Sequence, residues 1–187
     1  MPRMPARPSS VGGTLITLWS IGGVIGLLVQ AIVRLLPRAL EPILDGSLDV
    51  TAGVAYVAAI VFMAYGEGYR GFQQRFSPRA VVRALHLGAH PKPLLVVAAP
   101  LFAMGLIHAT RRRLIGSWML LLGIVGLIVL VSRLDQPWRG AVDAGVVVGL
   151  TWGAVATLAL LAQAWRGQGP EVDPELPGST PGPAPAG

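Results

Sequence analysis

The sequence predicts an all-α, multi-pass transmembrane helical bundle, and three observations lead to this class. The 187-residue chain is 53% hydrophobic and only 13% charged, whereas a soluble domain carries roughly 25% charged residues. Its mean hydropathy is +0.62. Long uncharged runs separated by arginines recur along the chain. Because a helix needs about 20 apolar residues to cross about 30 Å of hydrocarbon, these runs predict membrane-spanning helices.

Five runs are long enough to predict spans. The first exceeds the apolar region of a cleaved signal peptide, so we expect it to remain as an anchor. Pro100 predicts a kink in the third run, and the bundle has four spans if one short run does not cross. We expect disordered segments at 1–10 and in the Pro- and Gly-rich 167–187, on either side of a helical domain at 11–166. The predicted spans cover about residues 11–36, 48–66, 93–110, 114–132 and 143–165.

Residues 77–90 predict a short amphipathic helix on the membrane surface, between the second and third spans. Ser77 and Pro78 form a helix-start signal, and four cationic or titratable side chains then follow one helical face. A run of three arginines precedes the fourth span. Such clusters bind anionic lipid headgroups or dock a partner, so we predict that role for Arg79, Arg83, His86, His90, Arg111, Arg112 and Arg113.

The segment from Tyr65 to Phe76, YGEGYRGFQQRF, interrupts the apolar pattern. Its GEGYRG matches G-x-G-x-x-G but follows a predicted transmembrane helix and not a strand, so we reject a dinucleotide site. If the helix continues, one face carries an aromatic stripe and the next a polar cluster in which the acid and the arginine can pair. The stripe contains Tyr65, Tyr69, Phe72 and Phe76, and the cluster contains Glu67, Arg70 and Gln74.

Two interpretations of this segment stay open. In the first, the aromatic residues anchor the helix at the membrane interface and the Glu67–Arg70 pair is a structural clamp. In the second, Glu67 is a proton-accepting or substrate-binding carboxylate in a polar vestibule.

Glycines recur every four residues in the last predicted span, at Gly145, Gly149 and Gly153, and the first span repeats the device at Gly22 and Gly26. Such a strip lets another helix backbone approach closely. We predict helix packing at both strips, either within the bundle or between copies of the chain.

Several site classes are excluded or disfavoured. The chain has no cysteine, which rules out disulfides, thiolate catalysis and cysteine-based metal sites. His86 and His90 have chelating i, i+4 spacing, but HLGAH lacks the glutamate of H-E-x-x-H, and His108 lies at the far end of the predicted third span. We therefore predict no metal, no cofactor and no catalytic residue. Because the basic residues are spread between apolar runs, we also predict no nucleic-acid partner.

The scarcity of ionisable groups in the spans favours a non-catalytic accessory, assembly or scaffold subunit, and leans against an enzyme. Its expected partners are anionic lipids and a membrane protein or a second copy. One alternative is a small-solute or proton-coupled transporter or channel that uses Glu67 and Arg70, and another is a membrane enzyme with a histidine metal site. With five spans, the side of the N-terminus holds nine Arg or Lys and the other side six, which favours a cytoplasmic N-terminus in a bacterial inner membrane.

Overall fold

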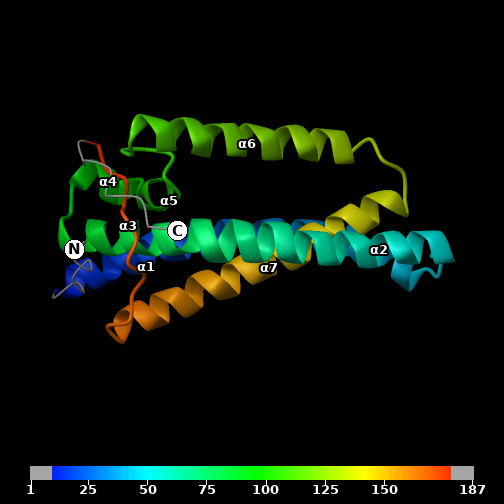
Figure 1. Ribbon diagram of the computed structural model, residues 1–187, viewed down its shortest axis with the longest axis horizontal. Helices are drawn as coiled ribbons and strands as arrows, with labels where there is room; N and C mark the ends of the chain where they lie inside the picture. The colour runs from blue at the N-terminus through cyan, green and yellow to red at the C-terminus, as the bar shows by residue number, and fades with distance from the viewer. Residues whose placement is uncertain (1–9, 178–187) are drawn as a thin grey trace, which may run out of the picture. The chain divides into compact units, whose positions relative to one another are not determined.

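The computed structural model describes residues 10–177, and every regular element in this part of the chain is a helix (Figure 1). The described residues contain no β-strand, so the predicted all-α class is confirmed. In chain order the elements are α1 (Val11–Leu44), α2 (Val50–Met63), the π-helix η1 (Ala64–Phe76), α3 (Ser77–Ala89), α4 (Pro93–Val97), α5 (Ala99–Ala103), α6 (Arg111–Val131) and α7 (Trp138–Trp165).

Four helical stretches of the described chain are long and apolar enough to cross a membrane. In the most apolar 18-residue window of each stretch, the protein itself buries only part of the residues. The buried share is 33% in α7 and 6% in α6. Most of these apolar side chains therefore need lipid or another chain to cover them, which indicates a membrane-embedded, multi-pass protein. The stretches are Val11–Leu44, Val50–Ala89, Arg111–Val131 and Trp138–Trp165.

The predicted fifth span at 93–110 is not confirmed, because this segment contains two helices of five residues each, α4 and α5. Prolines stand in the first turn of both helices, where they start a helix well but cannot continue one. After α5 the chain turns at Gly105 and His108, whose φ angles of 75° and 47° are incompatible with an α-helix. The structure thus has four candidate spans.

The helix predicted on the membrane surface at 77–90 also differs from the structure. Residues 77–89 do form a helix, α3, but it continues directly from η1, and most of it is buried, including Ala80, Ala84 and Gly88. These small residues recur every four positions and allow neighbouring backbones to come close. The Thr17 hydroxyl of α1 donates a hydrogen bond to the Ala84 carbonyl oxygen at 3.3 Å. The helix is therefore packed inside the protein, and the predicted position on a membrane surface is not confirmed.

The chain divides into two compact units. The first combines the chain up to Val24 with Phe76–Leu120 and the residues from Thr157 onward. The second combines Ile25–Arg75 with Leu121–Ala156. Each unit contains parts of α1, α6 and α7, because the unit boundaries fall inside these helices.

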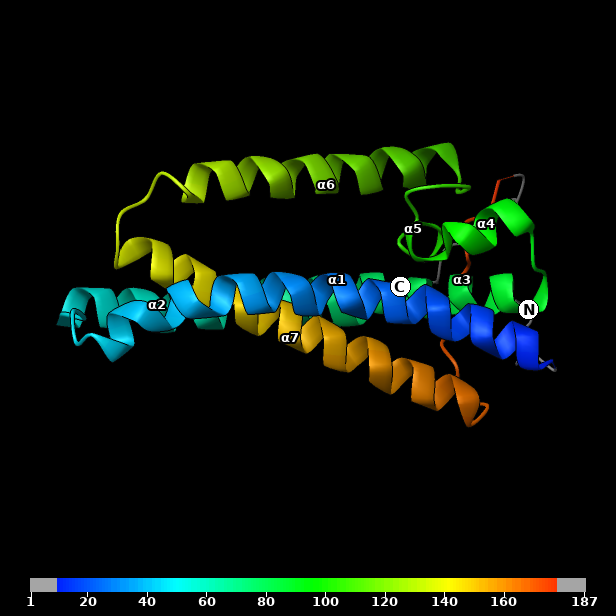
Figure 2. The ribbon, with the colours of Figure 1, turned by 180° about the vertical axis from the view of Figure 1, so that it is seen from behind.

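In the first unit, α5 lies beside α3, and α4 lies beside α5 (Figure 1 and Figure 2). Its apolar core is built on Leu87, Ala99 and Phe102, against which partly buried side chains such as Leu176 pack. Gly23 of α1 lies directly against the Pro100 ring, so a larger residue at position 23 would collide with α5. The Ser77 and Thr157 hydroxyls share a buried hydrogen bond of 2.8 Å.

In the second unit, α7 packs on α2 and η1 through residues that alternate between small and large. A Cβ atom at Gly145 would lie 2.7 Å from the Ala59 carbonyl oxygen, and one at Gly153 would lie 2.5 Å from the Phe72 ring. This small-to-large packing works in both directions, because Gly68 of η1 leaves room for the Trp152 side chain of α7. The Trp152 indole N–H donates to the Gln73 side-chain oxygen at 2.7 Å.

Candidate functional site

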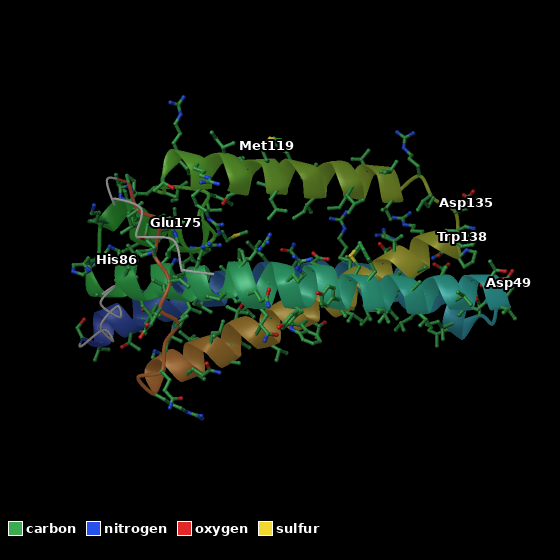
Figure 3. The ribbon with its side chains drawn as sticks, viewed as in Figure 1. Asp49, His86, Met119, Asp135, Trp138 and Glu175 are labelled. Carbon is green, nitrogen blue, oxygen red and sulfur yellow. The ribbon has the colours of Figure 1, made fainter. Side chains whose placement is uncertain are left out.

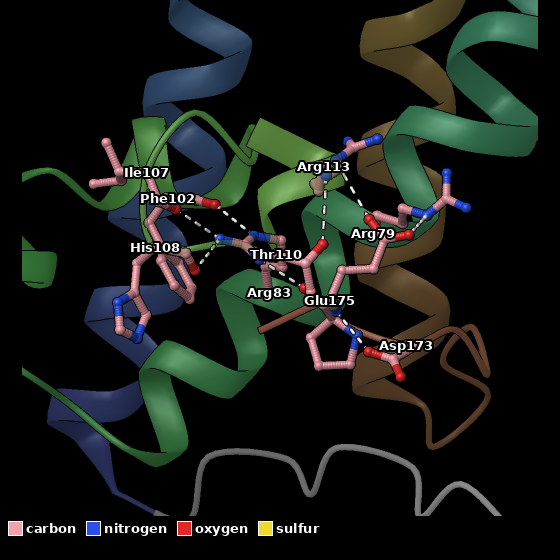
Figure 4. A network of polar contacts seen from close by, with 10 residues as sticks. Arg79, Arg83, Phe102, Ile107, His108, Thr110, Arg113, Asp173 and Glu175 are labelled. Carbon is pink, nitrogen blue, oxygen red and sulfur yellow. Dashed lines mark hydrogen bonds and ion pairs between the residues drawn. The ribbon is translucent and has the colours of Figure 1, made fainter. Parts of the chain in front are cut away.

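A buried arginine organises the first unit. Arg83 of α3 is 1% exposed, and its guanidinium donates to four backbone carbonyl oxygens (Figure 4). Nε donates to Phe102 at 2.6 Å, Nη1 to Pro174 at 2.6 Å, and Nη2 to Ile107 and His108 at 3.0 and 3.1 Å. The guanidinium carbon also lies 4.2 Å from the centroid of the Phe102 ring. Since a buried charge is tolerated only when it is well hydrogen-bonded, these contacts explain how Arg83 is accommodated.

This geometry corrects the predicted role of Arg83 in lipid or partner docking, because the guanidinium faces the interior. Its hydrogen bonds join α5, the turn after α5 and the C-terminal segment to α3. The planar fork of arginine suits this task, since its several N–H groups point in fixed directions. Arg83 is a structural centre of the unit.

A second cluster lies beside it, around Glu175 (Figure 4). The Glu175 carboxylate lies 3.7 Å from Nε of Arg79 and 3.6 Å from Nε of Arg113. Its backbone is also fixed, because Thr110 N–H donates to the Glu175 carbonyl oxygen at 2.8 Å and Glu175 N–H donates to an Asp173 carboxylate oxygen at 2.6 Å. One acid of the C-terminal segment thus bridges arginines from α3 and α6.

The segment after α7 therefore differs from the predicted disordered tail at 167–187. Residues 170–176 have no regular secondary structure and lie against the first unit, held at Pro174 and Glu175 and packed through Leu176. Composition alone favours disorder, but three arginines in the folded part offer partners to an acid and a carbonyl in this segment. Residues 178–187, and residues 1–9 of the predicted N-terminal segment, lie outside the described part of the chain.

The three histidines belong to the first unit. The His86 and His90 rings stack with centroids 4.9 Å apart, and the His108 ring lies 6.2 Å from that of Phe102. Burial and the nearby charges of Lys92 and Arg83 lower the pKa of His108 below its usual value. Figure 3 shows His86 on α3. Within residues 10–177, no three His, Cys, Asp or Glu side chains come together as a metal site.

The polar cluster predicted in 65–76 does not close into an ion pair. Glu67 is half-buried, with its carboxylate 3.0 Å from where a Cβ of Gly149 would stand. No ion pair joins Glu67 to Arg70 in the described chain; the Arg70 guanidinium instead lies 6.0 Å from the Tyr65 ring centroid. In a π-helix the hydrogen bonds run from i to i+5, so residues three apart no longer share a face. Gln74 is exposed.

The π-helical register also divides the predicted aromatic stripe. Tyr65 and Tyr69 are exposed and stack on each other with centroids 6.0 Å apart. Phe72 instead faces Gly153 of α7. Phe76 is half-buried at the junction with α3. The first two aromatic residues are thus available at the surface, and Phe72 belongs to the contact with α7.

The two glycine strips have different surroundings. Gly149 lies against Glu67 in the contact that also holds Gly145 and Gly153, whereas a Cβ at Gly22 or Gly26 would meet nothing within 4 Å. Of the arginines that open α6, Arg111 and Arg112 are exposed.

Sequence reasoning missed Gly23, Glu175 and Trp152. The sequence did contain a signal for Glu175. The segments before it carry an excess of arginine, so an acid in the C-terminal segment has basic side chains with which it can pair.

Comparison with models of protein families, with curated proteins and with solved structures finds no match for this chain.

Proposed function

We propose that this protein is a non-catalytic accessory or assembly subunit of a membrane complex, and that α6 is the helix that binds its partner. The observation that carries the proposal is the surface of α6. Val131 is its single buried residue within the described chain, while large apolar side chains stay exposed along its length, among them Met119, Leu122 and Ile128. Met119 can be seen on α6 in Figure 3.

Three glycines give α6 a face suited to another helix. A Cβ added at Gly116, Gly123 or Gly126 would meet nothing within 4 Å. At 100° per residue these positions fall within about a quarter of the helix circumference. A strip of small residues lets a second transmembrane helix approach closely, which lipid chains do not require. We therefore take the occupant to be a transmembrane helix of another membrane protein.

The exposed Arg111 and Arg112 at the start of α6 add charge beside this face. An acidic group at the matching end of the partner helix would meet them and fix the orientation of the pair. The helix itself is held in place at this end, because the Trp118 indole N–H donates to the Leu106 carbonyl oxygen at 3.1 Å.

Four spans also give a consistent orientation. The N-terminus, the 90–110 segment, the start of α6 and the C-terminal segment then share one side of the membrane. That side holds Lys92, the three arginines of α6 and Arg166, and the other side holds Arg34, Arg38, Arg133 and Arg139 at the helix ends. The excess of basic residues on the first side supports our proposal that this side faces the cytoplasm, as in an N-in protein of a bacterial inner membrane with anionic lipids.

The experiment purifies the tagged chain from its own membrane in mild detergent and quantifies co-eluting proteins by mass spectrometry. Gly123→Leu should reduce the retained partner at least tenfold, because the leucine blocks close approach. Since no described part of the chain lies within 4 Å of a Cβ at position 123, thermal stability should not fall. Val125→Leu, on the opposite face of α6, is the matched control and should retain the partner. Equal retention by both variants contradicts the proposal.

A second candidate function rests on Glu67. This carboxylate lies within an apolar stretch that can span a membrane, on a π-helix, and pairs with no basic side chain in the described chain. Ionisable groups at such positions serve proton or ion pathways, and π-helical segments often mark functional positions. In a proton-coupled transporter, Glu67→Gln abolishes flux into proteoliposomes while Gln74→Glu retains it. Unchanged flux in Glu67→Gln eliminates this candidate.

A further inference from the structure

We propose that the exposed face of η1 is a second interaction surface, where Arg70 pairs with a carboxylate on a transmembrane helix of another membrane protein. This η1 face contains Tyr65, Gly66, Arg70 and Gln74, all of them exposed. Positions four or five apart share a face here, because the hydrogen bonds of a π-helix run from i to i+5. The inference rests on the proposed role in a membrane complex, but it concerns a helix other than α6 and can fail while the α6 contact holds.

Contacts with α7 show the depth at which the η1 face lies. Residues 144–165 of α7 carry no charge, so this run is the part of the helix suited to cross the hydrocarbon. Glu67 lies against Gly149, and Phe72 lies against Gly153. Both contacts fall within about 8 Å of the middle of the run, at 1.5 Å per residue. Since the hydrocarbon extends about 15 Å to either side of its middle, the η1 face between these contacts lies inside it.

An exposed arginine at this depth needs an acidic partner. Ionisable side chains inside a membrane are costly and usually pair with one another. Within the described chain the Arg70 side chain makes no hydrogen bond or ion pair, and its guanidinium lies 6.0 Å from the Tyr65 ring centroid, at the outer limit of a cation–π contact. Snorkelling to the headgroups serves arginines near the ends of a span, whereas this one lies near the middle. The charge therefore calls for a carboxylate that another chain supplies.

Gly66 gives a partner helix room to approach the arginine. A Cβ at Gly66 would meet nothing within 4 Å. Small residues let the backbones of membrane helices come close, and polar side chains beside them then hydrogen-bond across the contact. A second copy docked on the same face would bring another arginine and no acid, since Glu67 points toward Gly149 of α7. The occupant is therefore a different membrane protein with an Asp or Glu in its span.

The test uses a synthetic transmembrane peptide of leucine and alanine with one central glutamate, and a matching peptide with a central glutamine. Each peptide carries an acceptor dye, and its association with the full-length protein in phosphatidylcholine bilayers is measured by energy transfer from the protein's tryptophans. The wild type should bind the glutamate peptide roughly three- to twenty-fold more tightly than the glutamine peptide, the range that polar contacts between membrane helices supply.

Variants assign this preference to the η1 face. Arg70→Gln should abolish it without loss of thermal stability, because the side chain is exposed and makes no hydrogen bond within the described chain. Arg111→Gln is the matched control, because it removes an equal charge from an exposed position of α6 and should keep the preference. Equal affinity of the wild type for the two peptides, or a preference that persists in Arg70→Gln, overturns the proposal. Since the peptides do not depend on the α6 partner, this proposal and the proposed function fail separately.

Cross-linking in native membranes then identifies the occupant. A short thiol-reactive photo-cross-linker is attached at Gln74→Cys, which is the only cysteine in that variant. An adduct with a transmembrane segment that carries an Asp or Glu, lost in the Arg70→Gln background, supports the proposal. No adduct, an adduct with a second copy of the chain, or an adduct with a segment that has no acid overturns it.

Discussion

Two helices of this protein carry glycines at close spacing and differ in what those glycines meet. In α7, Gly145, Gly149 and Gly153 lie against α2 and η1 so closely that an added Cβ would be 3.0 Å or less from a neighbouring atom. In α6, a Cβ at Gly116 or Gly123 would meet nothing within 4 Å. The same residue type therefore closes an internal contact in one helix and leaves a free face in the other.

The comparison shows that small residues in an apolar helix indicate close approach but not the identity of the approaching group. In α7 the group is a second helix of the chain itself. In α6 the described chain supplies none, and the proposed partner would. Substitutions that add volume at these positions should therefore act on stability in α7 and on association in α6.

The largest effect is expected for Gly145→Leu. A Cβ at this position would lie 2.7 Å from the Ala59 carbonyl oxygen, and backbone cannot move aside as a side chain can. We expect a loss of about 3 kcal/mol or more in the free energy of unfolding, at or above the upper end for overpacking. Thermal unfolding in detergent measures it, with Gly123→Leu as the control of equal added volume. Similar melting temperatures for the two variants would contradict the difference in packing between the glycines of α7 and those of α6.

A smaller effect is expected for Gly149→Ala. Here the nearest neighbour is the Glu67 carboxylate at 3.0 Å, the flexible end of a long side chain. A shift of Glu67 by a few tenths of an ångström relieves the contact, so we expect a loss of less than about 1 kcal/mol in the same thermal unfolding. A loss as large as that of Gly145→Leu would show that Glu67 is fixed in place by contacts stronger than those seen.

The smallest effect, and one of opposite sign, is expected for Gly116→Ala. The added methyl group meets nothing, and alanine favours a helix over glycine by up to about 1 kcal/mol. The protein should become slightly more stable or stay unchanged, as judged by its melting temperature in detergent. Destabilisation would mean that another part of the chain packs on this face of α6.

The sequence was a good guide wherever one physical requirement dominated. The apolar runs that need a membrane predict α1, α6 and α7, since about 20 consecutive apolar residues suit a membrane, although α1 continues to Leu44, past the predicted end at 36. The 93–110 run met the same composition test, but its prolines and the turn at Gly105 break the helix into two short pieces. Counting apolar residues does not detect such a break.

Pairings over long sequence distances were not predictable in the same way. Helical spacing suggested a Glu67–Arg70 pair and a surface position for Arg83, and both depended on assumptions about the helix around them. The π-helical register separates the first two residues, and the burial of α3 turns the third inward. The contact of Glu175 with Arg79 and Arg113 joins segments far apart in the chain, which composition and periodicity do not reveal.

The most direct test of the central claim is site-specific cross-linking from α6 in native membranes. The chain has no cysteine, so a single Leu120→Cys, at an exposed position on the edge of the glycine face, carries a short thiol-reactive photo-cross-linker without background labelling. The account predicts an adduct with one other membrane protein from position 120 and none from Val125→Cys on the opposite face. Absence of a protein adduct at position 120, or equal adducts from both positions, would contradict it.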